Sequence, residues 1–332
     1  MNTEVTVVVD AMGGDKAPKV VLEGVDLALA QDSQLTVILT GLAESIEAFA
    51  AERPGRVLAV ATTEVIDSNE HPAQAARTKK DSSIVVGCQL VKEGRAGGFF
   101  SAGSTGACMA AALLYIGRIR GIHRPAIATV LPSPVAPVIL TDIGANADVK
   151  PEYLLQFAQM AAVYAEHILQ VKEPRIGLLN IGEEETKGSE LARLTHQLMK
   201  QALPGFRGNV EGTDILNGSF DVIVTDGFTG NVTLKTIEGT AALMFDQLKQ
   251  VLTATTARKL AAAVIMPGLK QLKKNLSADE VGGAPLLGLK GSCIIGHGSS
   301  NAKAILNGIA VTARCIREQL PGIIEEAVVE HA

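Results

Sequence analysis

The sequence predicts an α/β protein whose mainly parallel β-sheet is covered by helices on both faces. Apolar, β-branched runs recur along the chain, each is followed by a glycine-rich or polar turn, and a helical pattern comes next. This alternation is typical of βαβ units. Among 332 residues, 47% are apolar, 33 are Gly and none is Trp, which fits a core of small aliphatic side chains joined by many tight turns.

The predicted strands can be placed in chain order. They cover residues 5–10, 35–41, 97–103, 222–227 and 292–298, and a helical pattern follows each of them. Residues 124–146 are rich in proline, which is found in edge strands and extended connections, so we expect the sheet to change character there. With no low-complexity linker, residues 1–322 are expected to form a single domain, and residues 323–332 a C-terminal tail.

Bulk properties exclude several classes of protein. The net charge of −5 argues against general nucleic-acid binding, which needs a basic face. The first ten residues lack the basic and apolar regions of a signal peptide. The four cysteines lie far apart without a CxxC pair, so we expect buried thiols in a reducing cytoplasm and no zinc site.

One uncharged segment approaches the length of a membrane span. It covers residues 96–117, but the sequence GSTG lies in its middle, between a strand-like half and an Ala/Leu-rich half. A strand, a loop and a buried helix are therefore predicted instead of a transmembrane helix.

Glycine-rich, hydroxyl-bearing turns occur at the ends of four predicted strands, at residues 10–15, 101–106, 226–231 and 296–300. In open parallel sheets, ligands collect at the carboxyl ends of strands, where helix N-termini point free amides outward and favour negative charge. We therefore expect these turns to converge on a phosphate or carboxylate site. Each turn alone is more often a plain connection than a binding site, and none matches a dinucleotide fingerprint or a Walker A loop.

The stretch LLNIGEEETKGS, residues 178–189, places three glutamates before a single lysine. We interpret LLNIG as a strand and Glu183–Glu185 as the first turn of the next helix, where carboxylates stabilise exposed N–H groups. This interpretation leaves Lys187 unexplained, because a cation near the positive end of a helix needs an anion or a glutamate to offset it. Phosphate is such an anion.

Eight segments occur in the order found in one known family. In this chain they read DAMGGD, SAGSTGA, DIGANAD, LLNIGEEETKGS, VEGTDI, DVIVTDGFTGNV, GGAPLLG and HGSSNAKA. From Val5 to about Gln319 the chain resembles the PlsX-type phosphate acyltransferases of bacterial phospholipid synthesis. One departure is Ser104, which stands where the family usually has asparagine; both side chains can form hydrogen bonds.

The resemblance implies a reaction and a fold. A long-chain acyl group would pass from the thioester of acyl carrier protein to inorganic phosphate, and the acyl phosphate would serve a membrane-bound glycerol-3-phosphate acyltransferase. The implied fold is a three-layer αβα sandwich like phosphotransacetylase and the isocitrate and isopropylmalate dehydrogenases, paired as a homodimer. No cofactor is implied, and no metal is expected, since the acidic residues lack the ordered spacing of a cation-binding loop.

Phosphate is already a competent oxygen nucleophile, so no serine or cysteine triad is required. By resemblance, Lys187 and Asn231 are the expected catalytic residues: Lys187 would neutralise the phosphate or the developing oxyanion, and Asn231 would donate its amide hydrogens to the same group. His297 could protonate the leaving thiolate or be a structural histidine at a turn. The expected substrate-binding residues are Asp10, Gly13, Gly14, Ser104, Thr105, Gly106, Asn146, Asp226, Thr229, Gly230 and His297.

Two surfaces are candidates for partners. Residues 255–277 suggest an amphipathic helical hairpin bent near Pro267-Gly268, with basic residues flanking an apolar tip. The pattern fits a dimer interface equally well, and the resemblance favours contact with the inner face of the cell membrane. The second surface is basic and would attract an acidic carrier protein, although it also fits solvated surface charge. The residues concerned are Leu260, Val264, Ile265, Met266 and Leu269 for the membrane, flanked by Arg258, Lys259, Lys270, Lys273 and Lys274, and Arg118, Arg120 and Arg124 for the carrier protein.

Three other functions compete with this hypothesis. A phosphotransacetylase acting on acyl-CoA would share the sheet and the phosphate site. A non-catalytic membrane scaffold would keep the fold but not the activity, and the presence of Lys187 and Asn231 argues against it. A dehydrogenase is disfavoured because no nicotinamide signature or metal-binding set of aspartates is recognisable.

Overall fold

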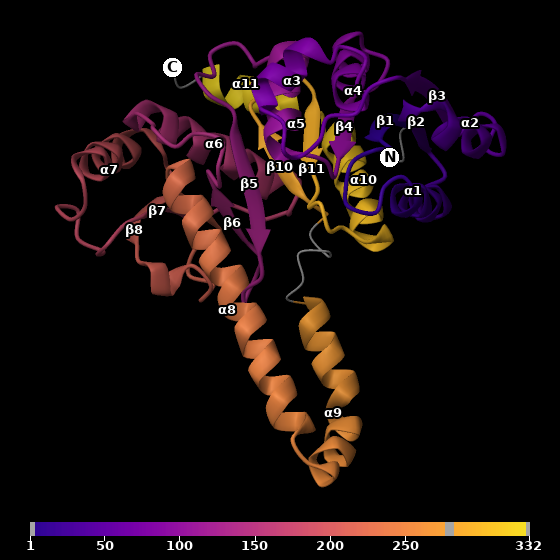
Figure 1. Ribbon diagram of the computed structural model, residues 1–332. Coiled ribbons are helices and arrows are strands. Elements are labelled where there is room, and N and C mark those ends of the chain that lie inside the picture. The colour runs from indigo at the N-terminus through magenta and orange to yellow at the C-terminus, as the bar shows by residue number, and fades with distance from the viewer. Residues whose placement is uncertain (1–3, 276–281, 330–332) are drawn as a thin grey trace.

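The computed structural model describes residues 4–275 and 282–329, in which one eleven-stranded sheet runs through the molecule (Figure 1). The strand order is β3-β2-β1-β4-β11-β10-β5-β6-β9-β7-β8. The strands are β1 (Val5–Asp10), β2 (Leu35–Leu42), β3 (Val57–Thr62), β4 (Gly98–Ser101), β5 (Ala126–Leu131), β6 (Val138–Thr141), β7 (Ile176–Leu179), β8 (Phe206–Val210), β9 (Val222–Val224), β10 (Ala284–Leu287) and β11 (Ser292–Ile295).

Helices cover both faces of this sheet, as Figure 1 shows. They are α1 (Lys19–Gln31), α2 (Ala43–Ala51), α3 (Pro72–Thr78), α4 (Ser83–Lys92), α5 (Thr105–Ala111), the π-helical turn η1 (Ala112–Ile116), α6 (Pro151–His167), α7 (Glu190–Ala202), the 3-10 turn η2 (Gly212–Asp214), α8 (Gly227–Thr253), α9 (Thr256–Asn275), α10 (Ala302–Arg317) and α11 (Leu320–Val329). The predicted α/β sandwich is therefore confirmed.

Alternation along β1 explains why both faces are covered. Val7 and Val9 are fully buried in one hydrophobic cluster, with side chains of α1, α6, α10 and α11. Val8 is equally buried in another cluster, with side chains of α4 and α5. Since successive side chains of a strand point to opposite faces, a strand without polar alternation must be covered on both.

The direction of the sheet reverses in its middle. β3, β2, β1, β4 and β11 pair in parallel, and so do β6, β9, β7 and β8, but β10 and β5 join these two halves by antiparallel pairing. The proline-rich stretch 124–146 forms β5 and β6, so the predicted change in the sheet is confirmed. The carboxyl ends of the two parallel halves consequently lie at opposite edges of the sheet.

Residues 96–117 form a strand, a loop and a helix, as predicted. β4 is followed by α5 and η1, whose residues Ala107, Ala111 and Ala112 are fully buried. None of the described helices is both long enough and apolar enough to cross a bilayer.

The prediction of a C-terminal tail is wrong for residues 323–329, which belong to α11. Leu320, Ile324 and Val328 repeat every four residues and are each at most 4% exposed, so one stripe of α11 lies in the core. Residues 330–332 of the predicted tail lie outside the described part of the chain.

The helical hairpin exists, but its turn is not where the sequence predicted it. α8 and α9 lie side by side and project from the body (Figure 1), and they are joined at Ala254-Thr255, while Pro267 lies inside α9. The Thr255 hydroxyl accepts a hydrogen bond from Arg258 N at 3.2 Å, which starts the second helix. At 1.5 Å per residue, α8 is about 40 Å long.

Candidate active site

The predicted site residues fall at two edges of the sheet. The turns after β1, β4 and β11 meet at one edge, which we call the Asp10 edge; the turns after β6, β7 and β9 meet at the other, the Lys187 edge. The expectation that all these turns converge on one pocket is therefore wrong. The turns lie apart because the antiparallel pairings of β11 with β10, β10 with β5 and β5 with β6 reverse the direction of the strands in the second half of the sheet.

At the Asp10 edge, a buried carboxylate ties two turns together. Asp10 is 1% exposed; its Oδ2 accepts a hydrogen bond from Ser101 Oγ at 2.7 Å, and its Oδ1 accepts one from Met12 N at 3.0 Å. Burial raises the pKa of Asp10, although hydrogen bonds from Ser101, Ser83 and Met12 oppose the rise. The Asp10 carboxylate therefore faces the protein interior.

The glycines of this edge allow close approach of backbone segments. A Cβ at Gly13 would lie 2.7 Å from both Asp10 Oδ2 and Gly103 N, and Gly14 has a φ of +109°. Asp15 N donates to Gly298 O at 2.8 Å, which joins the first turn to the turn after β11. A small pocket here is lined by Gly13, Gly14, Lys16, Ala17, Val20, Val21, Ala102, Gly298, Ser300 and Ile305.

Three more predicted residues of this edge have local structural contacts. The Ser104 hydroxyl caps α5 by accepting a hydrogen bond from Ala107 N at 3.4 Å, and Thr105 next to it is exposed. A Cβ at Gly106 would lie 2.7 Å from Pro72 Cγ, so this glycine lets α5 approach α3. His297 is exposed, and its Nδ1 lies 2.8 Å from Ser299 Oγ.

At the Lys187 edge, a second buried carboxylate organises the turn after β6. Asp142 is fully buried and accepts hydrogen bonds from Ile127 N, Ala145 N and both nitrogens of Asn146 at 2.7–3.1 Å. Burial raises the pKa of Asp142 against these bonds. Asn146 Nδ2 also donates to Pro125 O at 2.8 Å, so the Asn146 amide holds β5 and β6 together.

The first turn of α8 is pressed against this loop. Asp226 is the N-cap, and its carboxylate accepts hydrogen bonds from Thr229 N at 2.8 Å and Thr229 Oγ1 at 2.7 Å. Gly227 N donates to Asn146 O at 2.7 Å. A Cβ at Gly230 would lie 1.9 Å from Asp142 O, so only glycine fits there. This packing leaves the next residue, Asn231, exposed beside Gly144.

Lys187 lies in the loop between β7 and α7. The helix begins only after Ser189, whose hydroxyl accepts a hydrogen bond from Ala192 N at 3.2 Å, so the prediction that Glu183–Glu185 form its first turn is wrong. Lys187 is two residues ahead of this N-cap, at the positive end of α7, as predicted. Among the described residues, the one ion pair formed by the glutamate triplet joins Glu185 to Lys200, and Lys187 forms none.

Adjacent strands therefore carry the two predicted catalytic residues. Lys187 follows β7 and Asn231 follows β9, and the two strands pair in parallel, with Leu178 opposite Val224. Both side chains are exposed at the same edge, and Asn231 lies in the first turns of α8.

Sequence reasoning missed three exposed apolar side chains at this edge. Ile181 is 80% exposed, Phe228 67% and Val232 50%. Phe228, Asn231 and Val232 are spaced i, i+3 and i+4 along α8, so they share one face of the helix. That spacing could have been recognised in the motif DGFTGNV.

The predicted carrier-binding arginines also reach the Lys187 edge. Arg118, Arg120 and Arg124 are all exposed in the segment between η1 and β5, next to Pro125, whose carbonyl accepts the Asn146 hydrogen bond. Arg118 Nη1 donates to the backbone oxygens of Ile122 and His123, which holds this segment in a compact turn.

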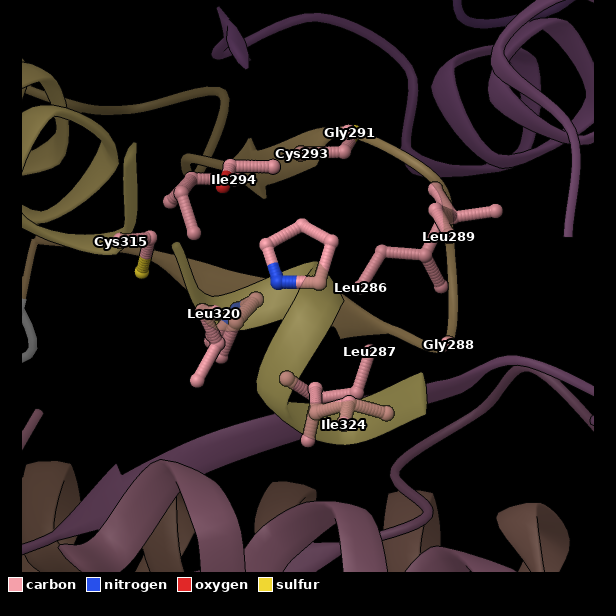
Figure 2. A pocket seen from close by; sticks show the side chains of 13 residues that line it. Leu286, Leu287, Gly288, Leu289, Gly291, Cys293, Ile294, Cys315, Leu320 and Ile324 are labelled. Atoms are coloured by element: carbon pink, nitrogen blue, oxygen red, sulfur yellow. The ribbon is translucent and has the colours of Figure 1, made fainter. Parts of the chain in front are cut away.

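An apolar pocket lies away from these residues, between β10, β11 and α11. In Figure 2, Leu320 and Ile324 of α11 lie near Leu286 and Leu287, with Cys315 at one side. All four cysteines are free and buried, as predicted, and burial raises the pKa of Cys293 and Cys315 to about 12. These thiols are thus protonated and enclosed, which is unsuitable for nucleophilic catalysis.

The overall architecture is that of the phosphotransacetylases. A phosphotransacetylase from Streptococcus pyogenes superimposes with a TM-score of 0.61 at 17% identity, covering 96% of this chain and 94% of the other. A phosphotransacetylase from Staphylococcus aureus also gives a TM-score of 0.61, at 16% identity, covering 94% of each chain. At such low identity the likeness defines the fold alone.

Sequence similarity defines the family. Residues 5–322 match the family model described as "Fatty acid synthesis protein", and the chain belongs to that family. A protein named phosphate acyltransferase from Desulfitobacterium hafniense is 53% identical over 323 residues, covering 96% of each chain. Proteins of the same name from Bacillus licheniformis and Bacillus subtilis are 47% and 44% identical over 327 and 326 residues, covering 98% of this chain and 99% and 98% of theirs.

Proposed function

We propose that this chain is a phosphate acyltransferase that moves a long-chain acyl group from acyl carrier protein to inorganic phosphate. The observation that carries this proposal is the position of Lys187 and Asn231, both exposed, in the segments that follow the carboxyl ends of two adjacent parallel strands. The similarity to proteins named phosphate acyltransferase supports the same reaction class.

In the proposed reaction, a phosphate oxygen attacks the thioester carbonyl carbon, a C–O bond forms and the C–S bond breaks. The products are acyl phosphate and the carrier thiolate, which takes up a proton. The Lys187 ammonium would offset the charge of phosphate or of the developing oxyanion, and the Asn231 amide would donate to the same oxygen. His297 follows β11 at the opposite edge, so we do not include it as the acid.

Two features of the Lys187 edge support an acylated protein as the donor. The exposed side chains of Ile181, Phe228 and Val232 give an apolar surface beside Asn231, as a fatty acyl chain requires. The exposed arginines of segment 118–124 carry charge opposite to that of an acidic carrier protein and would steer its approach.

We further propose a homodimer in peripheral contact with the membrane through the hairpin. Leu260 is 70% exposed and Val264 81%, while Leu269 is half-buried. Because the turn lies at Ala254-Thr255, these residues line the flank of α9 and not an apolar tip. The exposed basic residues Arg258 and Lys259 flank them near the turn, whereas the side chains of Lys270, Lys273 and Lys274 lie outside the described part.

An assay of the purified chain tests this function. Palmitoyl carrier protein and phosphate are supplied, and release of the carrier thiol is measured together with hydroxylamine-trapped acyl phosphate. We expect phosphate-dependent formation of both products. Faster turnover of palmitoyl-CoA than of the carrier thioester would favour a phosphotransacetylase acting on CoA esters, and a lack of turnover with either donor would favour a scaffold.

A further inference from the structure

We propose that Asn180 and Asn209 are positioning residues that hold Lys187 through the backbone of residues 181–188, here called the lysine loop. This inference rests on the proposed function, because it assigns a role only if Lys187 acts on the phosphate or the oxyanion. Neither asparagine needs to touch the substrate, since both bind backbone atoms of the loop.

The lysine loop has little internal structure to fix it. Within it, one backbone hydrogen bond is formed, from Lys187 N to Glu184 O at 3.0 Å, which closes a turn around the lysine. Such a turn at the surface exchanges readily with solvated conformations unless side chains hold it. The position of Lys187 must therefore be set by groups outside the loop.

Asn209 binds this turn from the neighbouring strand β8. It lies on β8, is 6% exposed, and its Nδ2 donates to Glu184 O at 2.9 Å, the same carbonyl that accepts the hydrogen bond from Lys187 N. A buried amide in a sheet has few alternative rotamers, because its neighbours are packed. Asn209 therefore fixes the turn to the rigid part of the molecule.

Asn180 closes the loop at both ends. Its Oδ1 accepts a hydrogen bond from Ile181 N at 2.8 Å, and its Nδ2 donates to Lys187 O at 3.1 Å. Gly188 makes this possible: its φ is +88°, and a Cβ there would lie 2.2 Å from Asn180 Oδ1. One amide thus bonds both to the first residue of the loop and to the backbone of the lysine itself.

The ion pair of Glu185 and Lys200 is the other side-chain contact of this loop, and it is too exposed to fix the lysine. The two side chains are 61% and 59% exposed, and exposed ion pairs contribute little because water screens them and both side chains lose freedom. The two amides are the more rigid restraints, because one is buried and the other bonds twice to the loop.

The position of the loop matters because catalysis depends on where the lysine ammonium can reach. Displacing a catalytic group by about 1 Å can lower the rate by about 10²-fold. We therefore expect Asn180→Asp and Asn209→Asp each to lower kcat by about 10- to 100-fold at saturating phosphate and acyl donor. An aspartate has the same shape as asparagine, but its carboxylate cannot donate to a carbonyl oxygen.

A double-mutant cycle separates positioning from general structural damage. Each asparagine variant is made in the natural chain and in Lys187→Ala, and the residual rates are compared. If the asparagines act through Lys187, the aspartate variants have no further effect once the lysine is removed. Equal losses of rate in both backgrounds, or unchanged kcat in the natural background, would overturn the proposal.

Two controls distinguish loss of the loop contacts from nonspecific effects of the substitutions. Asn217→Asp makes the same chemical change at an exposed amide that bonds to Asp214 and not to the lysine loop, so its kcat should stay unchanged. If Asn209→Asp does not fold because its carboxylate is buried, Asn180→Asp carries the test alone, since its side chain is only half-buried. Full activity of Lys187→Ala would instead contradict the proposed function itself.

Discussion

Lys187 and Asn231 are the residues on which the proposed chemistry depends, and both are exposed. Their removal therefore changes the charge and hydrogen bonding of the site without opening a cavity in the core. We predict that Lys187→Ala and Asn231→Ala each lower phosphate-dependent turnover by about 10²-fold or more, while the melting temperature stays within a few degrees. Steady-state assays and thermal melts check this, and a fully active variant would remove that residue from the mechanism.

Asp10 allows a prediction about pH. Burial raises the pKa of Asp10 in the folded state, so its carboxyl group stays protonated to a higher pH in the native protein than in the unfolded chain. The contribution of Asp10 to stability is therefore full below its unfolded pKa and is lost as the pH rises through its folded pKa, with a slope of at most about 1.4 kcal/mol per pH unit.

Asp10→Asn removes this titration. We predict that the unfolding free energy of the natural chain minus that of the variant falls as the pH rises from acidic values, and becomes constant once Asp10 is ionised in the folded state. Urea unfolding at a series of pH values measures it. A difference that is independent of pH, or that grows as the pH rises, would contradict the raised pKa.

At the level of single residues, the sequence predicted only part of the candidate site. Lys187 and Asn231 were predicted because their motifs are long and specific. The lysine loop was mistaken for the first turn of a helix, because Glu183–Glu185 suit such a turn as well as they suit a loop. Asn209 carried no signal of its own, since it contacts Glu184 only through the pairing of β7 with β8.

At the scale of elements, α8 connects the candidate site with the hairpin. Its first turn packs on the Asp142 loop, while its middle residues face solvent. Helices and strands with clear periodicity were predicted well. The length of α8 was not, because the pattern of residues 233–253 does not show that the helix projects from the body. The turn is made by Ala254-Thr255 and not by Pro267-Gly268.

Two glycines of α8 form a matched pair for testing this packing. A Cβ at Gly230 would lie 1.9 Å from Asp142 O, whereas nothing lies within 4 Å of one at Gly239. We predict that Gly230→Ala destabilises the protein by about 1–3 kcal/mol or more and also lowers turnover, because the start of α8 must shift.

Gly239→Ala should instead stabilise the helix, by up to about 1 kcal/mol, because alanine has the higher helix propensity. Chemical unfolding of both variants provides the measurement. Equal effects of the two substitutions would mean that α8 does not press on the Asp142 loop.

At the scale of the whole molecule, the order and direction of the strands were the hardest features to predict. Local patterns identify strands, but β10 pairs with β5, which lies more than 150 residues earlier in the chain, and no local pattern encodes that pairing. The division of the predicted site residues between two edges follows from this pairing, which explains why it could not be foreseen.

The hairpin provides a prediction at the same scale. Val264→Glu with Ile265→Glu places two charges on the exposed flank of α9 and should reduce co-sedimentation with anionic liposomes several-fold. Val135→Glu, at a position that is 74% exposed on the body, serves as the control. Undiminished binding of the double variant would refute membrane contact, and a loss of dimer measured by light scattering would assign this flank to the subunit interface.

The reversal of strand direction gives the two ends of the strands separate surroundings. The carboxyl end of β9 lies at the edge of the sheet that holds the amino ends of β4 and β11, and the turns around Gly14 and Gly298 lie at the opposite edge. We therefore expect a protein bound at the carboxyl end of β9 to leave the turns around Gly14 and Gly298 accessible.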